Sequence, residues 1–172
     1  MSKHFFSGCT SAKLDSKKRF VLPQAMRNGL VEDGELKCTI ALGLGGCLAI
    51  YRRSAIDEIV KRFRTKQHVA KYQKFFTLFF STLYHTTCDA VGRITLPESL
   101  KRAAGIEGEI AIAGVMNKIE IWPKEVYDQN LAQLMYGQAE DTDLRETLAE
   151  AFALLEESAE VLEQETNEEA LV

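Results

Sequence analysis

Apolar positions in the first three quarters of the chain fall into short runs of strand length, separated by turn residues. Alternation within these runs predicts strands rather than long helices. The predicted strands are residues 20–22, 36–41, 47–51, 94–96, 109–113 and 118–122. Pro23 and Pro97 follow the two shortest strands, and each suits the first turn of a short helix. Those helices are expected to end near Gly29 and Gly105.

Residues 54–84 change to a helical spacing of apolar positions. Ser54 is a suitable N-cap for a first helix, and a second helix is predicted over about residues 69–83. One broad face of the second helix would carry Tyr72, Phe76, Phe79, Phe80 and Leu83. An aromatic stripe of this kind is typical of a core or a subunit interface, and base stacking is the alternative.

Two segments of the chain share one pattern at a distance of 74 residues. The pattern D-x-x-x-R-x-x-L-P-x-x-[ML]-[RK] occurs at residues 15–27 and again at residues 89–101. Each D-x-x-x-R segment is predicted to form a tight turn, with Lys18 or Gly92 at its tip. Similarity continues into the following strands, so the chain holds two copies of a unit of about 40 residues, too small to bury a sufficient core alone. The two copies are therefore expected to share one core.

Charge is divided unevenly along the chain. Residues 1–127 carry 20 Lys and Arg against 12 Asp and Glu, a net charge of +8. Residues 128–172 carry 1 against 13, a net charge of −12, so the total is only −4. Such asymmetry is typical of a body that faces nucleic acid or a membrane, joined to an interaction tail. The pI of about 5.5 therefore does not exclude a DNA-binding body.

Basic residues are frequent around the predicted helices of residues 54–84. They form either a solvated helix face or a set of secondary phosphate contacts, and both interpretations stay open. The residues concerned are Arg52, Arg53, Lys61, Arg62, Arg64, Lys66, Lys71 and Lys74.

The acidic tail predicts an amphipathic helix that begins near Asp141. Its apolar stripe consists of Leu144, Leu148, Ala151, Leu155 and Leu162. Residues beyond Glu163 have the composition of a disordered segment. The tail either packs its leucines on the body or acts as an acidic arm, which competes with DNA phosphates or binds a partner.

Candidate chemistry for catalysis or metal binding is sparse. The four cysteines include no CxxC pair, so we expect small, buried or half-buried thiols in a reducing cytoplasm rather than a zinc site. The three histidines belong to no catalytic or metal pattern, and the glycines at 43–46 predict a hairpin turn. We expect no enzyme, no cofactor, no metal and no small-molecule ligand. Without a long apolar stretch, the protein is expected to be soluble and cytoplasmic.

Four motifs give the chain a family resemblance. They are residues 14–19 (LDSKKR), residues 88–93 (CDAVGR), Gly46-Cys47-Leu48 before Tyr51, and residues 117–122 (NKIEIW). On these motifs the body, roughly residues 5–127, resembles the MraZ family of bacterial transcriptional regulators. The pair of D-x-x-x-R segments, each followed by a strand and a proline, is the most specific part of the resemblance.

The resemblance implies an α+β fold in which two AbrB-like halves form a swapped-hairpin, double-split β-barrel. It also implies a homo-oligomeric ring, with the octamer favoured, that binds repeated short boxes of double-stranded DNA. The boxes would lie upstream of the division and cell-wall gene cluster, which places the protein at the nucleoid. The expected segments are a first half at 5–53, a helical insert at 54–84, a second half at 85–127 and an acidic, partly disordered helical tail at 128–172.

By the same resemblance, the two D-x-x-x-R turns are the DNA-reading elements. Arginine is the residue that reads guanine, through two hydrogen bonds in the major groove, and an aspartate four residues earlier could hold the guanidinium. Lysines beside the first turn would contact phosphates. The predicted DNA-binding residues are Lys13, Asp15, Lys17, Lys18, Arg19, Asp89 and Arg93. A local salt bridge at each turn is the alternative.

The first turn departs from the family pattern, which has glycine before the arginine. Lys18 stands at that position, whereas Gly92 keeps the pattern in the second turn. If a positive φ is needed there, lysine carries a steric cost, so we expect the first loop to differ in shape, with the added charge as compensation.

Two other classes of protein compete with the DNA-binding interpretation. AbrB-like barrels also occur as antitoxins that bind a toxin through a C-terminal arm, and the acidic tail could serve as one. A scaffold ring, in which the arginine turns are structural, is the third class. Both halves in one chain favour the regulator over the antitoxin, and sequence-specific DNA binding would separate the regulator from the scaffold.

Overall fold

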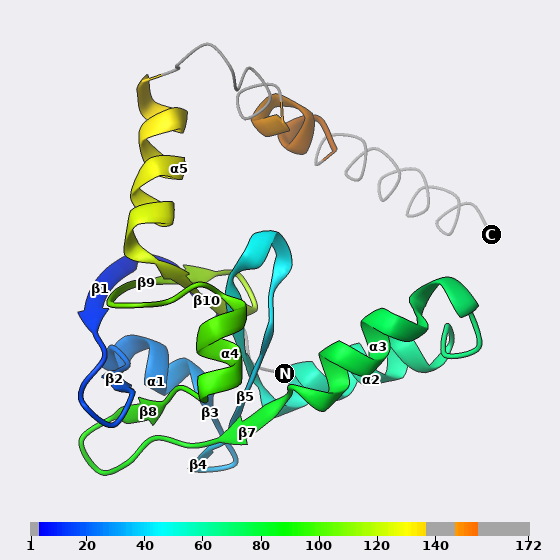
Figure 1. Cartoon of the computed structure of the whole chain (residues 1–172), viewed down its shortest axis with the longest axis horizontal. Coiled ribbons are helices and arrows are strands. Elements are labelled where there is room, and N and C mark those ends of the chain that lie inside the picture. The colour runs from blue at the N-terminus through cyan, green and yellow to red at the C-terminus, as the bar shows by residue number, and fades with distance from the viewer. Residues whose placement is uncertain (1–3, 137–146, 155–172) are drawn as a thin grey trace, which may run out of the picture. The chain divides into compact units, whose positions relative to one another are not determined.

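The computed structural model describes residues 4–136 and 147–154 (Figure 1). The chain divides into two compact units, Met1–Tyr127 and Asp128–Val172, and the first is called the body here. None of the described helices is long and apolar enough to cross a membrane.

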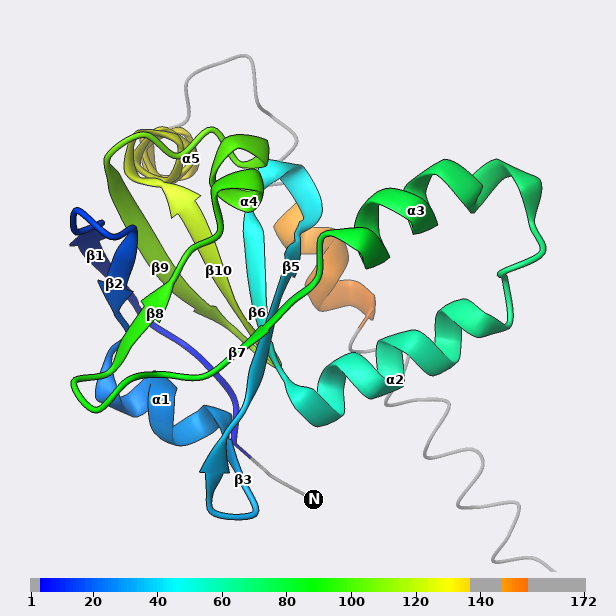
Figure 2. The same cartoon turned by 60° about the horizontal axis from the view of Figure 1, so that its bottom comes forward.

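A six-stranded antiparallel sheet forms the centre of the body (Figure 2). The strand order is β1-β9-β10-β6-β5-β7. Their bounds are β1 Cys9–Lys13, β5 Cys38–Leu42, β6 Leu48–Arg52, β7 Tyr84–Thr86, β9 Glu109–Val115 and β10 Lys118–Pro123. Short two-stranded pairs accompany it: β2 Arg19–Val21 with β8 Arg93–Thr95, and β3 Val31–Glu32 with β4 Glu35–Leu36.

The two copies of the repeat exchange strands throughout the body. β1 of the first copy pairs with β9 of the second, in the register Cys9↔Ala113. β7 of the second copy pairs with β5 of the first, in the register Cys38↔Thr86. Neither copy therefore completes a sheet without the other, which confirms that the two copies share one core.

That core lies between the inner face of the sheet and the short pair β2–β8. Phe20 and Ile94 face each other across this pair and are fully buried, because successive side chains of a strand point to opposite faces and these two point to the core. Leu22 and Leu96 follow them into the same cluster. Helices α1, Gln24–Leu30, and α4, Glu98–Ala103, start directly after Pro23 and Pro97, as the sequence predicts.

One predicted strand is wrong. Residues 36–41 do not form one strand, because the chain breaks at the exposed Lys37 between the β3–β4 hairpin and β5. The predicted hairpin turn at 43–46 is confirmed, since this segment joins the antiparallel strands β5 and β6, and it contains a short 3-10 helix, η1 Leu44–Gly46, in which Gly45 takes a φ of 78°.

Helices α2 and α3 form a hairpin that projects beside the sheet (Figures 1 and 2). α2 spans Arg53–Arg64, η2 spans Ala70–Tyr72 and α3 spans Gln73–Ser81. The predicted N-cap is wrong, since Ser54 lies inside α2 and its backbone N–H donates to Glu32 Oε1 at 3.1 Å. Glu32 comes from β3, so a carboxylate distant in sequence satisfies this helix-terminal donor.

The aromatic stripe of α3 packs around one phenylalanine of α2. Phe63 lies within 5.4–6.0 Å, centroid to centroid, of four rings on α3. Only Phe79 is buried, whereas Tyr72 and Phe80 stay 41% and 37% exposed. The stripe is thus the small core of the hairpin on one side and an apolar surface on the other.

Arg52 contradicts both interpretations of the basic residues near the helices. Its side chain is buried at the end of β6, where Nε donates to the Gly29 carbonyl and Nη2 donates to the His4 carbonyl at 2.9 Å. Its guanidinium also lies 4.7 Å from the centre of the Phe6 ring. Arg52 therefore fastens the N-terminal segment and α1 to the sheet, and is neither solvated nor available to phosphate.

The thiols follow the prediction with one exception. Cys38 and Cys47 are buried and Cys88 is half-buried, but Cys9 is exposed on the edge strand β1. Burial raises the pKa of the Cys38 thiol to about 12 and that of the Cys47 thiol to about 11. These thiols are held in the protonated form and serve as small packing groups.

A helix that the sequence did not predict, α5 Lys124–Tyr136, follows β10 in the same way that α2 follows β6. Residues 147–154 are helical and include the predicted stripe positions Leu148 and Ala151. The predicted helix start at Asp141, the stripe positions Leu144, Leu155 and Leu162, and the segment beyond Glu163 lie outside the described residues.

Candidate nucleic-acid interface

The first D-x-x-x-R turn is built around the Asp15 carboxylate. Its Oδ1 accepts hydrogen bonds from the backbone N–H groups of Lys17 and Arg19, both at 2.9 Å. Its Oδ2 accepts from Arg19 Nε at 2.8 Å. The backbone closes the turn, since Asp15 N–H donates to the Arg19 carbonyl at 2.9 Å and Lys18 N–H donates to the Asp15 carbonyl at 3.0 Å. One side chain thus shapes the loop and orients the arginine.

The second turn repeats this network bond for bond. Asp89 Oδ1 accepts from the backbone N–H groups of Val91 and Arg93 at 3.0 and 2.9 Å. Asp89 Oδ2 accepts from Arg93 Nε at 2.7 Å. The closing backbone bonds join Asp89 and Arg93, and Gly92 and Asp89, both at 3.0 Å. The expectation that the first loop differs in shape is therefore wrong.

Both turns have a residue with a positive φ at the tip, so they differ in the tip side chain and not in the backbone. Gly92 has a φ of 90°, and Lys18 has a φ of 60°. Lysine can adopt the left-handed region at some steric cost, so the first turn keeps the same backbone shape as the second.

Hydrogen bonds to both carboxylates keep them ionised. Donation from the backbone N–H of Arg93, with its guanidinium as a further donor, lowers the pKa of Asp89 to about 2. The corresponding groups of Arg19 also lower the pKa of Asp15 below its usual value. Both turns therefore keep a carboxylate–guanidinium pair throughout the neutral range.

The turns are joined into one unit by strands β2 and β8. Arg19 pairs with Thr95, and Val21 pairs with Arg93, in an antiparallel register. Leu22 N–H donates to the Gly92 carbonyl at 3.0 Å and Leu96 N–H donates to the Lys18 carbonyl at 2.8 Å. Each turn is thus tied through its tip to the strand that follows the other turn.

Arginine donors remain available on each turn. The side chains of Arg19 and Arg93 are 25% and 34% exposed. Nε is taken by the aspartate, and the described part of the chain shows no hydrogen bond from the terminal nitrogens of either guanidinium. An end-on pair of N–H donors on a fixed support matches an acceptor pair such as O6 and N7 of guanine.

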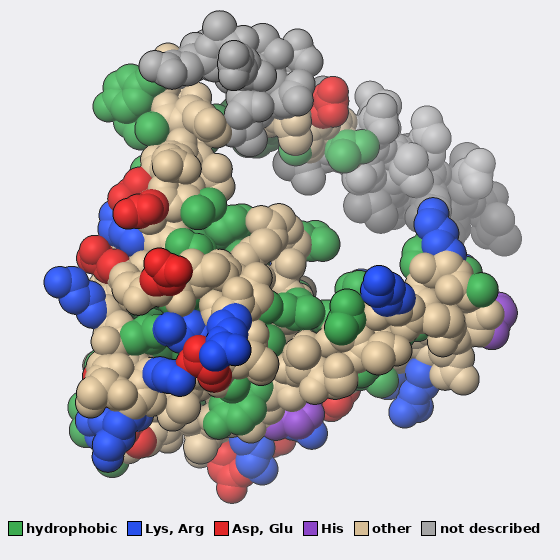
Figure 3. Space-filling view, viewed as in Figure 1, with side chains coloured by type: hydrophobic (Ala, Val, Ile, Leu, Met, Phe, Trp, Pro, Cys, Tyr) green, Lys and Arg blue, Asp and Glu red, His purple; other side chains and the backbone are tan. Residues whose placement is uncertain are grey.

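The three predicted lysines differ in whether they already have an ionic partner. Lys13, at the end of β1, and Lys17, in the first turn, have exposed side chains. Lys18 instead forms an ion pair through Nζ with Glu98 Oε2, at the start of α4. Figure 3 shows Lys and Arg side chains over α4 and near the loops that precede β2 and β8, with further ones on the α2–α3 hairpin.

Two residues near the turns were missed by the sequence reasoning. Glu98 pairs with Lys18 and also accepts from Arg102 Nε at 3.1 Å. Arg27, on α1, donates through Nη1 to the Val91 carbonyl at 3.2 Å. Both lie within the repeated pattern, but the Lys18–Glu98 and Arg27–Val91 contacts cross between the copies, so no local spacing indicates them.

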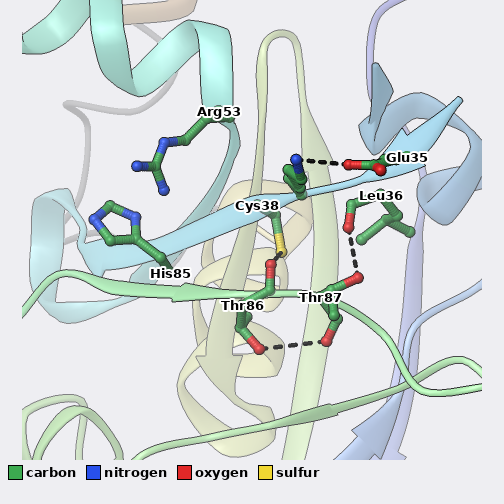
Figure 4. A pocket seen from close by; sticks show the side chains of 8 residues that line it. Glu35, Leu36, Cys38, Arg53, His85, Thr86 and Thr87 are labelled. Atoms are coloured by element: carbon green, nitrogen blue, oxygen red, sulfur yellow. Dashed lines mark hydrogen bonds and ion pairs between the residues drawn. The ribbon is translucent and has the colours of Figure 1, made fainter. Parts of the chain in front are cut away.

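A separate cavity of about 620 Å³ lies beside β5 and β7 (Figure 4). His85 and Arg53 point into it, and the Glu35–Lys37 ion pair of 2.6 Å crosses its rim. His85 Nδ1 is hydrogen-bonded to the buried Thr39 hydroxyl at 2.8 Å, and desolvation lowers the pKa of His85. No residue of the two turns lines this cavity. No group of three or more potential metal ligands occurs among the residues that the structure describes.

Comparison with known proteins places these turns in a family context. A sequence model of the family described as "MraZ protein, putative antitoxin-like" matches the chain twice, at residues 5–76 and 79–150. Each match includes one D-x-x-x-R turn, and the second extends beyond residue 127, where the sequence resemblance ended, to include α5.

Two curated relatives carry the name "Transcriptional regulator MraZ". The protein from Finegoldia magna is 33% identical over 131 residues, which cover 74% of this chain and 89% of the relative. The protein from Desulforamulus reducens is 31% identical over 129 residues, which cover 74% of this chain and 88% of the relative. With its two strand-exchanging copies and its two matched turns, this chain belongs to the MraZ family.

Proposed function

We propose that this chain is a DNA-binding transcriptional regulator that reads base edges through its two D-x-x-x-R turns. The observation that carries the proposal is the duplicate network in which Asp15 and Asp89 each hold an arginine through Nε, while its terminal nitrogens make no hydrogen bond within the described part of the chain. The names of the relatives support the same role.

Guanine is the base that this geometry favours. A guanidinium held through Nε presents its two terminal nitrogens as a fork, which can donate to O6 and N7 in the major groove. Because the aspartate fixes the fork before binding, little side-chain freedom is lost on contact. We therefore propose that Arg19 and Arg93 read G-containing boxes.

Phosphate contacts would supply affinity without sequence preference. Lys13 and Lys17 are exposed near the first turn, and the body has a net charge of +8. Lys18 contributes less than predicted from the sequence, because Glu98 already neutralises its ammonium.

At the level of assembly, we propose a swapped-hairpin, double-split barrel within a ring, with the octamer favoured. The β1–β9 and β5–β7 exchanges support the swapped arrangement. A ring would repeat the turns and so raise the effective concentration at DNA boxes spaced to match its subunits. The boxes are expected before the division and cell-wall gene cluster.

Protein binding through the C-terminal unit is a second candidate function. Leu148 and Phe152 are 53% and 63% exposed in the helical residues 147–154, and Met135 and Tyr136 of α5 are 60% and 76% exposed. A helix with exposed apolar residues and an acidic environment suits an antitoxin-type arm. Removal of residues 138–172 should then abolish partner binding while leaving the affinity for DNA unchanged.

Selection of bound duplexes from a random pool tests the main proposal. The wild-type protein should enrich repeated G-containing boxes, and Arg19→Ala or Arg93→Ala should lose about 1–3 kcal/mol of discrimination at one base position each. Arg62→Ala, an exposed arginine on α2, is the matched control and should keep the enriched sequence. Light scattering checks that the oligomer stays intact. Enrichment of the same boxes by both turn variants would refute the proposed reading role.

A further inference from the structure

Arg27 lies across the tip of the second turn although it belongs to the first copy of the repeat. It extends from α1, and its Nη1 donates to the Val91 carbonyl at 3.2 Å. Val91 precedes the tip glycine, donates its own backbone N–H to Asp89, and is 61% exposed. The guanidinium of Arg27 therefore lies at the tip of the second turn, against Val91 and Gly92.

Gly92 leaves room for this guanidinium. A Cβ built on Gly92 would lie 1.7 Å from Arg27 Nη1 and 2.4 Å from Cζ. Two features of this position therefore favour glycine: the φ of 90° and the close packing of the Arg27 guanidinium.

The first turn has a different cation at its tip. Lys101 is the residue of the second copy that corresponds to Arg27, but it makes no hydrogen bond or ion pair with the first turn in the described part of the chain. The tip residue Lys18 is itself the cation there, and Glu98 pairs with it. The two turns therefore match in backbone but differ in charge, because the first tip is neutralised by a carboxylate.

Arg27 keeps its positive charge uncompensated at the second tip. No carboxylate pairs with it among residues 4–136 and 147–154, and its one hydrogen bond there goes to a neutral carbonyl. Arginine has five N–H donors, and a planar fork with unused donors is suited to phosphate oxygens. A half-buried anchor for the side chain reduces the entropy lost when a phosphate is bound.

We propose that Arg27 and the second turn form a phosphodiester-binding site at the turn tip, whereas the cation at the tip of the first turn, Lys18, is already paired with Glu98. The site rests on the proposed DNA-binding function and extends it, since it names the contact that anchors the DNA backbone beside the base read by Arg93. The two turns of one chain are then unequal partners, with the second anchored to phosphate through a residue of the first copy.

Salt-dependent binding tests this site. The probes are the duplex selected from a random pool by the wild-type protein and an unrelated duplex of equal length. Arg27→Gln should make the plot of log K against log salt less steep by about 0.9 for each bound second turn, and should weaken binding to both duplexes by the same factor. Lys101→Gln, the corresponding position in the second copy, is the matched control and should leave the slope unchanged. Arg27→Lys should keep most of the slope.

Two outcomes would overturn the site. An unchanged slope for Arg27→Gln, with weaker binding to the selected duplex alone, would show that Arg27 only braces Arg93. An equal loss of slope in Lys101→Gln would show general electrostatics and no special contact. If instead the wild-type protein binds both duplexes equally, the proposed reading function fails, whatever Arg27 does, so the two failures are distinguishable.

Discussion

Replacement of Gly92 by alanine probes the conformation on which the second turn depends. Gly92 has a φ of 90°, a region that residues with a Cβ rarely adopt, and the surrounding hydrogen bonds to Asp89 and Leu22 leave the backbone little freedom to relax. A strained residue of this kind costs about 1–3 kcal/mol. The new Cβ also displaces Arg27, but the end of that side chain is flexible, so the larger share of the loss comes from the backbone.

Thermal and urea unfolding measure this loss. At about 2–4 °C per kcal/mol for a chain of this size, the midpoint of Gly92→Ala should fall by roughly 2–12 °C. Lys18→Ala is the matched control at the other tip. Because residue 18 already has a φ of 60° with a side chain, the substitution removes only an exposed ion pair and should leave the midpoint nearly unchanged.

Combining Gly92→Ala with Arg27→Ala separates the two causes. If backbone strain dominates, the midpoint falls by the same amount with or without the arginine. A loss that disappears in the Arg27→Ala background would show that the side-chain contact sets the cost. Full stability of Gly92→Ala alone, or an equal loss in Lys18→Ala, would refute the account of both tips.

Three further predictions concern other parts of the body. Arg52→Met should lower the free energy of unfolding, measured in urea, by about 1–3 kcal/mol, because the buried Gly29 carbonyl loses its donor. Arg53→Met, at the exposed neighbouring position, should be nearly neutral, and equal losses in the two variants would contradict this role of Arg52. Phe63→Ala should remove roughly 3 kcal/mol from the α2–α3 hairpin, seen as faster amide exchange in α3 with unchanged exchange in β9 and β10. The Asp89 carboxyl should titrate near pH 2 by NMR, because its pKa is lowered from the usual 3.8. Its contribution to stability is present above pH 3.8 and is lost as the pH falls through 2. A titration midpoint near 3.8 would contradict the hydrogen-bond network around Asp89.

Local sequence signals were sufficient for much of the fold. The D-x-x-x-R turns, the strands after them and the helices that begin after Pro23 and Pro97 depend on neighbouring residues, so their patterns are visible in the sequence. The shared core also followed from the size of the repeat, since a unit of about 40 residues cannot bury enough apolar surface by itself.

Features that depend on distant partners were missed or wrong. Ser54 looks like an N-cap, but α2 already starts at Arg53, so Ser54 lies inside the helix and its own backbone N–H donates to Glu32. Arg52 resembles its exposed neighbours in the sequence, and only the carbonyls of Gly29 and His4 account for its burial. The contacts of Arg27 and Lys18 are equally invisible, because their partners lie in the other copy.

The exchange of strands between the copies has a consequence for synthesis on the ribosome. β2 has no partner until β8 emerges, and the two turns lie 74 residues apart. At about 5–20 residues per second, the first turn waits roughly 4–15 s for the second. During that interval β1 and β5 each have an unpaired edge, to which another nascent chain could add its β9 or β7. The α2–α3 hairpin, which lies between the two turns, therefore lengthens the time in which neighbouring chains on one message can exchange strands before each chain closes on itself.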